Sequence, residues 1–150
     1  MNQLNLVAAR GVAVPEFPTD SGPADYVHFV DRVSVGIIEA KKDCAGVTLT
    51  VTKCQTGRYV NATLKHRQDS ALLRFLFQAT GKIIRFTDAA DPVPRSREIF
   101  HIFKPETLVF WLAQTETLRR RLAEQMSALP ERNLRDCQIS AVTGLEKSLA

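Results

Sequence analysis

The sequence predicts a mixed α/β fold, of the α+β or the α/β class, rather than a helical bundle. Strand-like runs rich in Val, Ile, Phe and Tyr come first, and further runs of this kind follow a helical stretch in the middle of the chain. After Pro105 the pattern is helical to the end. The 150 residues, of which 45% are hydrophobic and 24% charged, suit a single hydrophobic core.

Three strands are predicted at the start of the chain, where Asp, Gly and Pro separate short apolar runs. They span residues 11–17, 24–30 and 34–40. Residues 47–52 (VTLTVT) form either a further strand or an extended lead-in. A helix is predicted over residues 53–64, where Cys54, Tyr59 and Leu64 fall loosely on one face.

The second half of the chain adds strands and then helices. Strands are predicted over residues 72–78 and 82–87, which a tight turn joins, and over residues 98–103. Pro105 suits the first turn of a helix, and the helical pattern continues to residue 129 with a break near Gln114. A last helix is predicted from about residue 133 to the C-terminus.

Composition excludes several classes of protein. The formal net charge of +4 is compatible with a polyanionic partner without requiring one. Three cysteines without CxxC spacing argue against a disulfide framework or a zinc site, and fit the cytoplasm. No apolar run is long enough to cross a membrane, so no membrane partner is expected, and the start has no signal-peptide pattern.

An acid and a base stand two residues apart at the end of the third predicted strand. Side chains two apart share a face of a strand, so Glu39 and Lys41 point the same way. Asp25 begins the preceding strand, and a suitable hairpin register brings it beside Glu39. Two carboxylates that converge in this way suit Mg²⁺, and a neighbouring ammonium suits the charge that develops on a phosphate. The alternative is a surface Glu–Lys ion pair of little energetic value.

The hairpin register decides between these two interpretations. In an antiparallel pair, the numbers of opposed residues sum to a constant, and Asp25 faces Glu39 only if that constant is even. A three-residue loop at residues 31–33 satisfies this condition, whereas a plain two-residue turn sends Glu39 to the opposite face. The functional interpretation therefore predicts an odd loop or a β-bulge between Val30 and Ser34.

The stretch GPADYVHFVDRVSVGIIEAKK (residues 22–42) resembles the PD-(D/E)xK nuclease core of the restriction subunits of type I restriction–modification enzymes. The similarity continues in order through residues 80–112 and 133–150. It implies a restriction-endonuclease-like core, in which a central mixed sheet is flanked by helices and followed by a helical C-terminal extension. The nuclease core would span residues 1–104, and residues 105–150 would be a helical linker and the start of a helicase domain.

The resemblance also implies roles for particular residues. Asp25 and Glu39 would bind Mg²⁺ with the backbone carbonyl of Ala40, and Lys41 would be the catalytic lysine. Gln55 and Tyr59, spaced QxxxY, match a motif that some branches of this nuclease superfamily place beside the site. The reaction would be Mg²⁺-dependent hydrolysis of DNA by a type I restriction endonuclease. The modification and specificity subunits of the complex would select the DNA.

Two departures from the family pattern shape further expectations. The helical segment that normally precedes the first strand is expected to be missing, and Glu16, which could supply its acidic residue, is expected to be a plain strand residue. Gln138, in RDCQ, resembles the adenine-reading glutamine motif of superfamily 2 helicases, but no P-loop follows it. ATP would therefore act in a full-length subunit and not in this chain.

Two questions stay open from the sequence. Arg119, Arg120 and Arg121 could contact phosphates or form a solvated helix face. The chain could also be a truncated, non-catalytic fragment, or an assembly module that docks on partner subunits.

Overall fold

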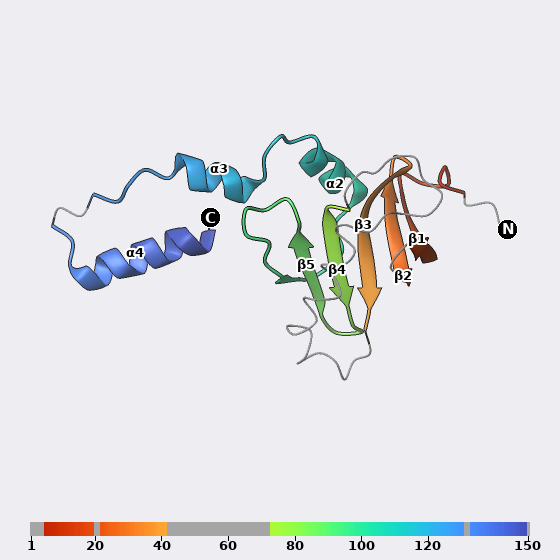
Figure 1. Ribbon diagram of the computed structural model, residues 1–150, viewed down its shortest axis with the longest axis horizontal. Coiled ribbons are helices and arrows are strands. Elements are labelled where there is room, and N and C mark those ends of the chain that lie inside the picture. Colours follow the sequence, from red (N-terminus) through yellow and green to blue (C-terminus); the bar gives the residue numbers. More distant parts are fainter. Residues whose placement is uncertain (1–4, 20–21, 42–72, 131–132, 150) are drawn as a thin grey trace.

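One mixed β-sheet forms the body of the molecule (Figure 1). The computed structural model describes residues 5–19, 22–41, 73–130 and 133–149. The sheet has six strands in sequential order, namely β1 (Gly11–Thr19), β2 (Gly22–Val30), β3 (Val33–Ala40), β4 (Phe75–Ala79), β5 (Ile84–Asp88) and β6 (Arg97–Ile99). Neighbouring strands are antiparallel except β3 and β4, which are parallel. The predicted mixed α/β class is confirmed.

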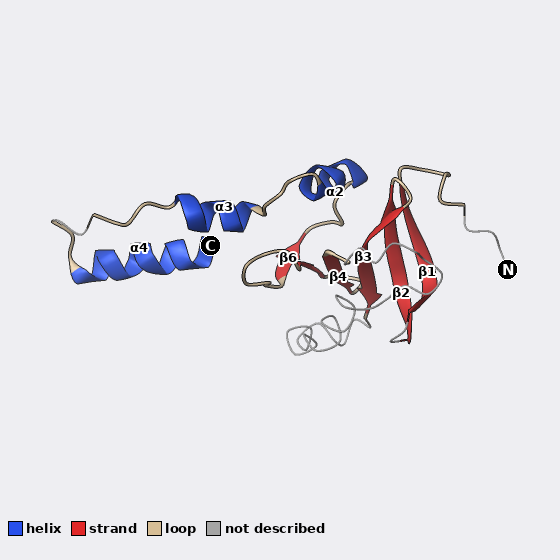
Figure 2. Cartoon of the chain, turned by 45° about the horizontal axis from the view of Figure 1, so that its top comes forward, coloured by secondary structure: helices blue, strands red, loops and turns tan. Residues whose placement is uncertain are grey.

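Three helices follow the sheet in the described part of the chain: α2 (Pro105–Leu112), α3 (Leu118–Gln125) and α4 (Asp136–Leu149). Pro105 opens α2, as its position predicts. The predicted break near Gln114 is confirmed, and α3 restarts after Thr117, whose hydroxyl accepts a hydrogen bond from the Arg120 amide at 3.2 Å. Figure 2 shows α3 and α4 projecting beyond the sheet, which is the predicted helical extension.

The predicted strand over residues 98–103 is wrong in its second half. β6 ends at Ile99, and the side chain of Phe100 is fully exposed. Phe103 instead turns inward, and its ring lies 5.0 Å from that of Phe86 and 4.8 Å from that of Trp111, measured between centroids. Burial of these aromatic surfaces outweighs continued strand pairing.

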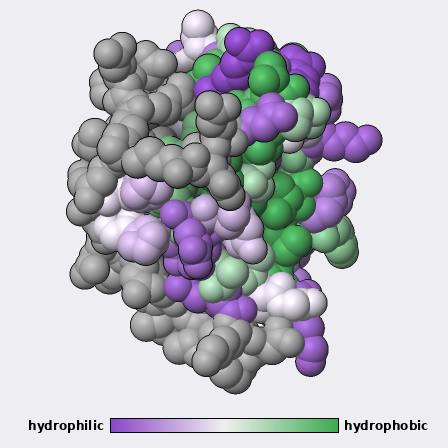
Figure 3. All heavy atoms as spheres, turned by 90° about the vertical axis from the view of Figure 1, so that its right-hand side faces the viewer, coloured by the Kyte–Doolittle hydropathy of each residue, from purple (hydrophilic) through white to green (hydrophobic). Residues whose placement is uncertain are grey.

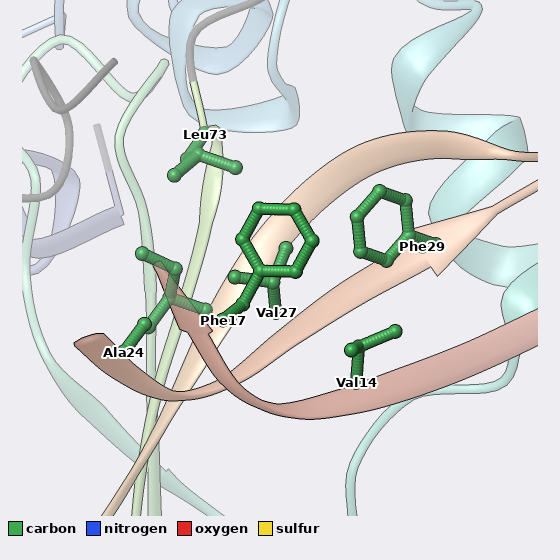
Figure 4. Close-up of a cluster of buried hydrophobic side chains, with 7 residues drawn as sticks. Val14, Phe17, Ala24, Val27, Phe29 and Leu73 are labelled. Carbon is green, nitrogen blue, oxygen red and sulfur yellow. The ribbon is translucent and has the colours of Figure 1, made fainter. Parts of the chain in front are cut away.

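Two hydrophobic clusters lie against the sheet. The first joins β1, β2 and β3 to Leu73, and Figure 4 shows its side chains, which are Val14, Phe17, Ala24, Val27, Phe29, Ile37 and Leu73. The second gathers Val30, Val35, Ile38, Phe75, Phe77, Phe86 and Leu108. Leu108 is the fully buried residue of α2, so this helix covers the second cluster. At the β1 end of the molecule, hydrophobic and hydrophilic side chains share the surface (Figure 3).

The predicted elements over residues 47–52 and 53–64 lie outside the described residues. They belong to the connection between the parallel strands β3 and β4.

Candidate active site

Asp25, Glu39 and Lys41 lie at one edge of the sheet, where β3 ends and β2 begins. Because β3 and β4 are parallel, their C-terminal ends meet there, with Glu39 opposite Gln78 and Ala40 opposite Ala79. The Lys41 amide donates to the Ala79 carbonyl at 2.7 Å, which extends this pairing beyond the end of β3. β2 begins at the same edge, since it runs antiparallel to β3.

The register of the β2–β3 hairpin brings Asp25 to the end of β3. The opposed residue numbers sum to 64 in this part of the hairpin, as in the pairs Tyr26–Ile38, Val27–Ile37 and His28–Gly36. One further step of the same register places Asp25 opposite Glu39. The side chain of Asp25 caps the end of the pairing, because its Oδ2 accepts a hydrogen bond from the Ala40 amide at 2.8 Å. The register that the functional interpretation requires is therefore present.

A β-bulge produces this register, as predicted, but it lies further along the strand than expected. The predicted three-residue loop is wrong, because Val30 pairs directly with Val33 and leaves a two-residue turn. The register then shifts between the pairs Phe29–Ser34 and His28–Gly36, which leaves Val35 as the extra residue. Val35 is buried in the second hydrophobic cluster, and this burial offsets the local loss of regular pairing.

The turn itself uses left-handed backbone conformations at two residues other than glycine. Asp31 has a φ of 48° and Arg32 a φ of 69°, as in a type I′ hairpin. Arg10 makes two contacts with Asp31. The Asp31 amide donates to the Arg10 carbonyl at 2.9 Å, and the Asp31 carboxylate pairs with the Arg10 guanidinium at 3.2 Å. These contacts, together with the tolerance of Asp for this conformation, compensate for the absence of glycine.

Glu39 and Lys41 form an ion pair, but not on the surface. The Lys41 Nζ lies 2.9 Å from the Glu39 Oε2. The side chain of Glu39 is only 7% exposed, and that of Lys41 is 24% exposed. A buried ion pair contributes little net stability, because the loss of hydration largely cancels the attraction. Because the Glu39 side chain is buried, this ion pair differs from the surface Glu–Lys pair that was the alternative interpretation of the sequence.

The donor set at this edge fits Mg²⁺ in chemical type. Carboxylate oxygens of Asp25 and Glu39 and the carbonyl oxygen of Ala40 are the hard ligands that this ion prefers, and it usually keeps several waters. In the described ranges, no group of three or more His, Cys, Asp or Glu side chains lies close enough to hold a metal. A metal here would therefore rely on two carboxylates, backbone oxygen and water.

Other residues singled out in the sequence fall in different places. Gln55 and Tyr59 lie outside the described residues. Gln138 lies in the first turn of α4, where its side-chain oxygen accepts a hydrogen bond from the Arg135 amide at 2.9 Å and so caps the helix. Glu16 lies within β1, as expected, but it is exposed and its φ of 48° departs from regular strand geometry.

The three consecutive arginines of α3 do not share one environment. Arg120 and Arg121 are exposed, which agrees with a solvated face. Arg119 instead links α3 to the rest of the chain, with its Nε 3.5 Å from the Asp91 carboxylate and its guanidinium bonded to the Ser148 carbonyl. Burial raises the pKa of Asp91, whose side chain is 4% exposed in this ion pair. Arg119 thus has a structural contact that the sequence did not indicate.

Sequence reasoning missed two polar residues that the sheet places in line with Glu39. Gln78 of β4 is opposite Glu39, and Arg85 of β5 is opposite Gln78, so the three share one face. Gln78 is buried, with 6% of its surface exposed. The alternation of β4 could have shown that Gln78 faces away from Phe75 and Phe77. Nothing local could have shown that it lies beside Glu39.

Comparison with known families assigns the chain to a class. The described sheet brings Asp25, Glu39 and Lys41 to one of its edges. Residues 6–108 match the family model described as the second domain of the endonuclease subunit of the type I restriction enzyme EcoKI. The chain belongs to this family. Comparison with curated proteins and with solved structures finds no significant match.

The matched segment contains Asp25, Glu39, Lys41 and Gln78, so the whole described edge of the sheet lies within the family domain. The family supports a role in a restriction system as part of a multisubunit complex. None of the described helices is long and apolar enough to span a membrane.

Proposed function

We propose that this chain is a nuclease domain with a PD-(D/E)xK core, which hydrolyses DNA phosphodiester bonds with Mg²⁺ as part of a type I restriction endonuclease. Membership of the restriction endonuclease family supports the proposal at the level of the complex. The observation that supports the proposal for particular residues is the bulged register of the β2–β3 hairpin, which aligns Asp25 with Glu39. Without the bulge at Val35, these two carboxylates would belong to opposite faces of the sheet.

Asp25 and Glu39 would hold the metal, together with the carbonyl of Ala40. Mg²⁺ bound there would polarise the phosphodiester and lower the pKa of a bound water. Both acids lie on neighbouring strands rather than on loops, and the Ala40 amide already orients Asp25 at 2.8 Å. Such support holds ligands in a fixed geometry, as a metal site requires.

Lys41 would act on the phosphate. Its side chain lies at the same edge as Glu39 and is 24% exposed, so a bound DNA strand could reach it. A cation fixed beside the scissile phosphate stabilises the negative charge that develops in the transition state. Gln55 and Tyr59 would complete the site, as the family resemblance implies, with residues 1–104 as the nuclease core and residues 105–150 as the linker toward a motor.

DNA binding by this domain would depend on contacts to phosphates. Affinity should therefore fall steeply as the salt concentration rises, and it should not depend on base sequence. The specificity and modification subunits would choose the DNA, and ATP would serve a motor that Gln138 precedes in the family.

A non-catalytic docking module is the second candidate function. Large apolar side chains lie exposed on all three described helices, with Phe110 61%, Leu118 63% and Leu145 61% exposed. Such surfaces often mark contacts with other proteins. A docking module would need these helices but would not need the acidic residues at the edge of the sheet.

Metal binding separates the two candidates. We expect calorimetry with Mn²⁺ to detect binding to the parent chain and to detect none for Glu39→Ala or for the isosteric Glu39→Gln, because each removes a charged ligand. Glu124→Ala is the matched control, since Glu124 is an exposed acid on α3 and not on the sheet. Absence of binding by the parent would favour the docking module, as would equal binding by the Glu39 variants.

A further inference from the structure

Gln78 occupies a position that packing alone does not explain. It lies on β4 directly opposite Glu39, and both side chains are buried, with residue exposures of 6% and 5%. Leu76, two residues earlier on the same face, is apolar and equally buried. An apolar side chain at position 78 would therefore suit the sheet, and burying a carboxamide there has a cost unless its polar atoms are used.

The neighbours of Gln78 on either side carry opposite charges. Glu39 is its partner on β3, and Arg85 is its partner on β5. The guanidinium of Arg85 is fixed at this point, because its Nε donates to the Ser96 hydroxyl at 3.0 Å and its Nη2 donates to the Ser96 carbonyl at 3.1 Å. A carboxamide suits this position, because its NH₂ group donates and its oxygen accepts.

We propose that Gln78 is a positioning residue of the metal site, whose carboxamide orients the Glu39 carboxylate from the β4 side. Lys41 holds one carboxylate oxygen of Glu39, at 2.9 Å from Oε2. A donor on β4 would hold the carboxylate from a second direction and fix the plane that it presents to the metal. Hydrogen-bond partners of this kind commonly change metal affinity by about 10-fold to 100-fold when they are removed.

This inference rests on the proposed function, because it presumes that Glu39 binds a metal. The test compares Mn²⁺ affinity by calorimetry in the parent and in Gln78→Met, which keeps the length of the side chain and removes its hydrogen-bonding atoms. Gln78→Leu is a second variant of the same kind. Thr87→Val is the matched control, since Thr87 lies on the same face of β5, opposite Leu76 rather than in line with Glu39. Thermal unfolding of each variant reports its folding.

We expect the Mn²⁺ dissociation constant of Gln78→Met to rise by about tenfold, with a cooperative thermal transition retained and with Thr87→Val like the parent. Cleavage by a complex that contains the variant should recover at raised Mn²⁺ concentration, which a purely structural defect would not do. Parent-like affinity in Gln78→Met would overturn the inference and leave the proposed function standing. An equal loss in Thr87→Val, or loss of folding in both Gln78 variants, would also overturn it. A parent chain that binds no Mn²⁺ would instead refute the proposed function itself.

Discussion

Replacing Lys41 by alanine is expected to abolish DNA cleavage by a restriction complex that contains this chain. Removing a group that stabilises developing charge typically lowers the rate by about 10²-fold to 10³-fold. The Lys41 ammonium lies 2.9 Å from the Glu39 carboxylate at the edge of the sheet, where the phosphate would bind. DNA translocation should be unchanged, and thermal unfolding of the variant reports its folding, because Lys41 is the ion-pair partner of the buried Glu39 carboxylate. Plasmid cleavage and translocation assays on the same preparation measure both.

Lys82→Ala is the matched control for this variant. Lys82 is an exposed lysine in the turn between β4 and β5, and its removal changes the net charge by the same amount. It should cleave DNA at the parental rate. Cleavage by Lys41→Ala at that rate would show that this lysine has no catalytic role.

Replacing Phe86 by alanine is expected to give the largest loss of stability. Phe86 is fully buried at the centre of an aromatic group, with ring centroids 5.1 Å from Phe77, 5.0 Å from Phe103 and 5.9 Å from Trp111. A Phe→Ala change in a packed core typically lowers the free energy of unfolding by about 3–5 kcal/mol. At about 2–4 °C per kcal/mol for a chain of this size, the melting temperature should fall by roughly 6–20 °C. Thermal unfolding followed by circular dichroism measures the shift.

Phe100→Ala provides the comparison, because the same deletion is made where the ring is fully exposed. Its melting temperature should stay close to that of the parent. Equal destabilisation by the two changes would contradict the arrangement of the second hydrophobic cluster. Such a result would mean that burial of Phe86 does not hold β5 beside β4, the strand that carries Gln78.

The sequence could predict much of the three strands β1, β2 and β3, because their contacts are local. Alternating and β-branched runs located all three N-terminal strands, and a parity argument identified the need for an odd loop or a bulge. The position of the bulge could not be predicted, since it depends on burial of Val35 against Phe75 and its neighbours, which are distant in the chain. The turn was equally difficult, because Asp31 and Arg32 adopt a conformation that their residue types only tolerate.

The place of Gln78 beside Glu39 could not be predicted from the sequence, for a different reason. Its strand was predicted, but 38 residues separate it from its partner Glu39, and the pairing of two strands so distant in the chain leaves no local signal. The two strands are aligned by packing of the sheet as a whole. Gln78 and Arg85 come into line with Glu39 only through this alignment. Only the structure therefore shows that they lie beside the candidate site.

The central claim is that Asp25 and Glu39 bind one metal ion, and a crystal of this chain grown with Mn²⁺ tests it most directly. Carboxylate oxygens of the two residues should lie within about 5 Å of each other, close enough to share an ion at roughly 2.1 Å per ligand. We predict an anomalous difference peak between them, next to the Ala40 carbonyl. Carboxylates on opposite faces of the sheet, or a metal bound elsewhere with this edge empty, would contradict the claim and the function proposed from it.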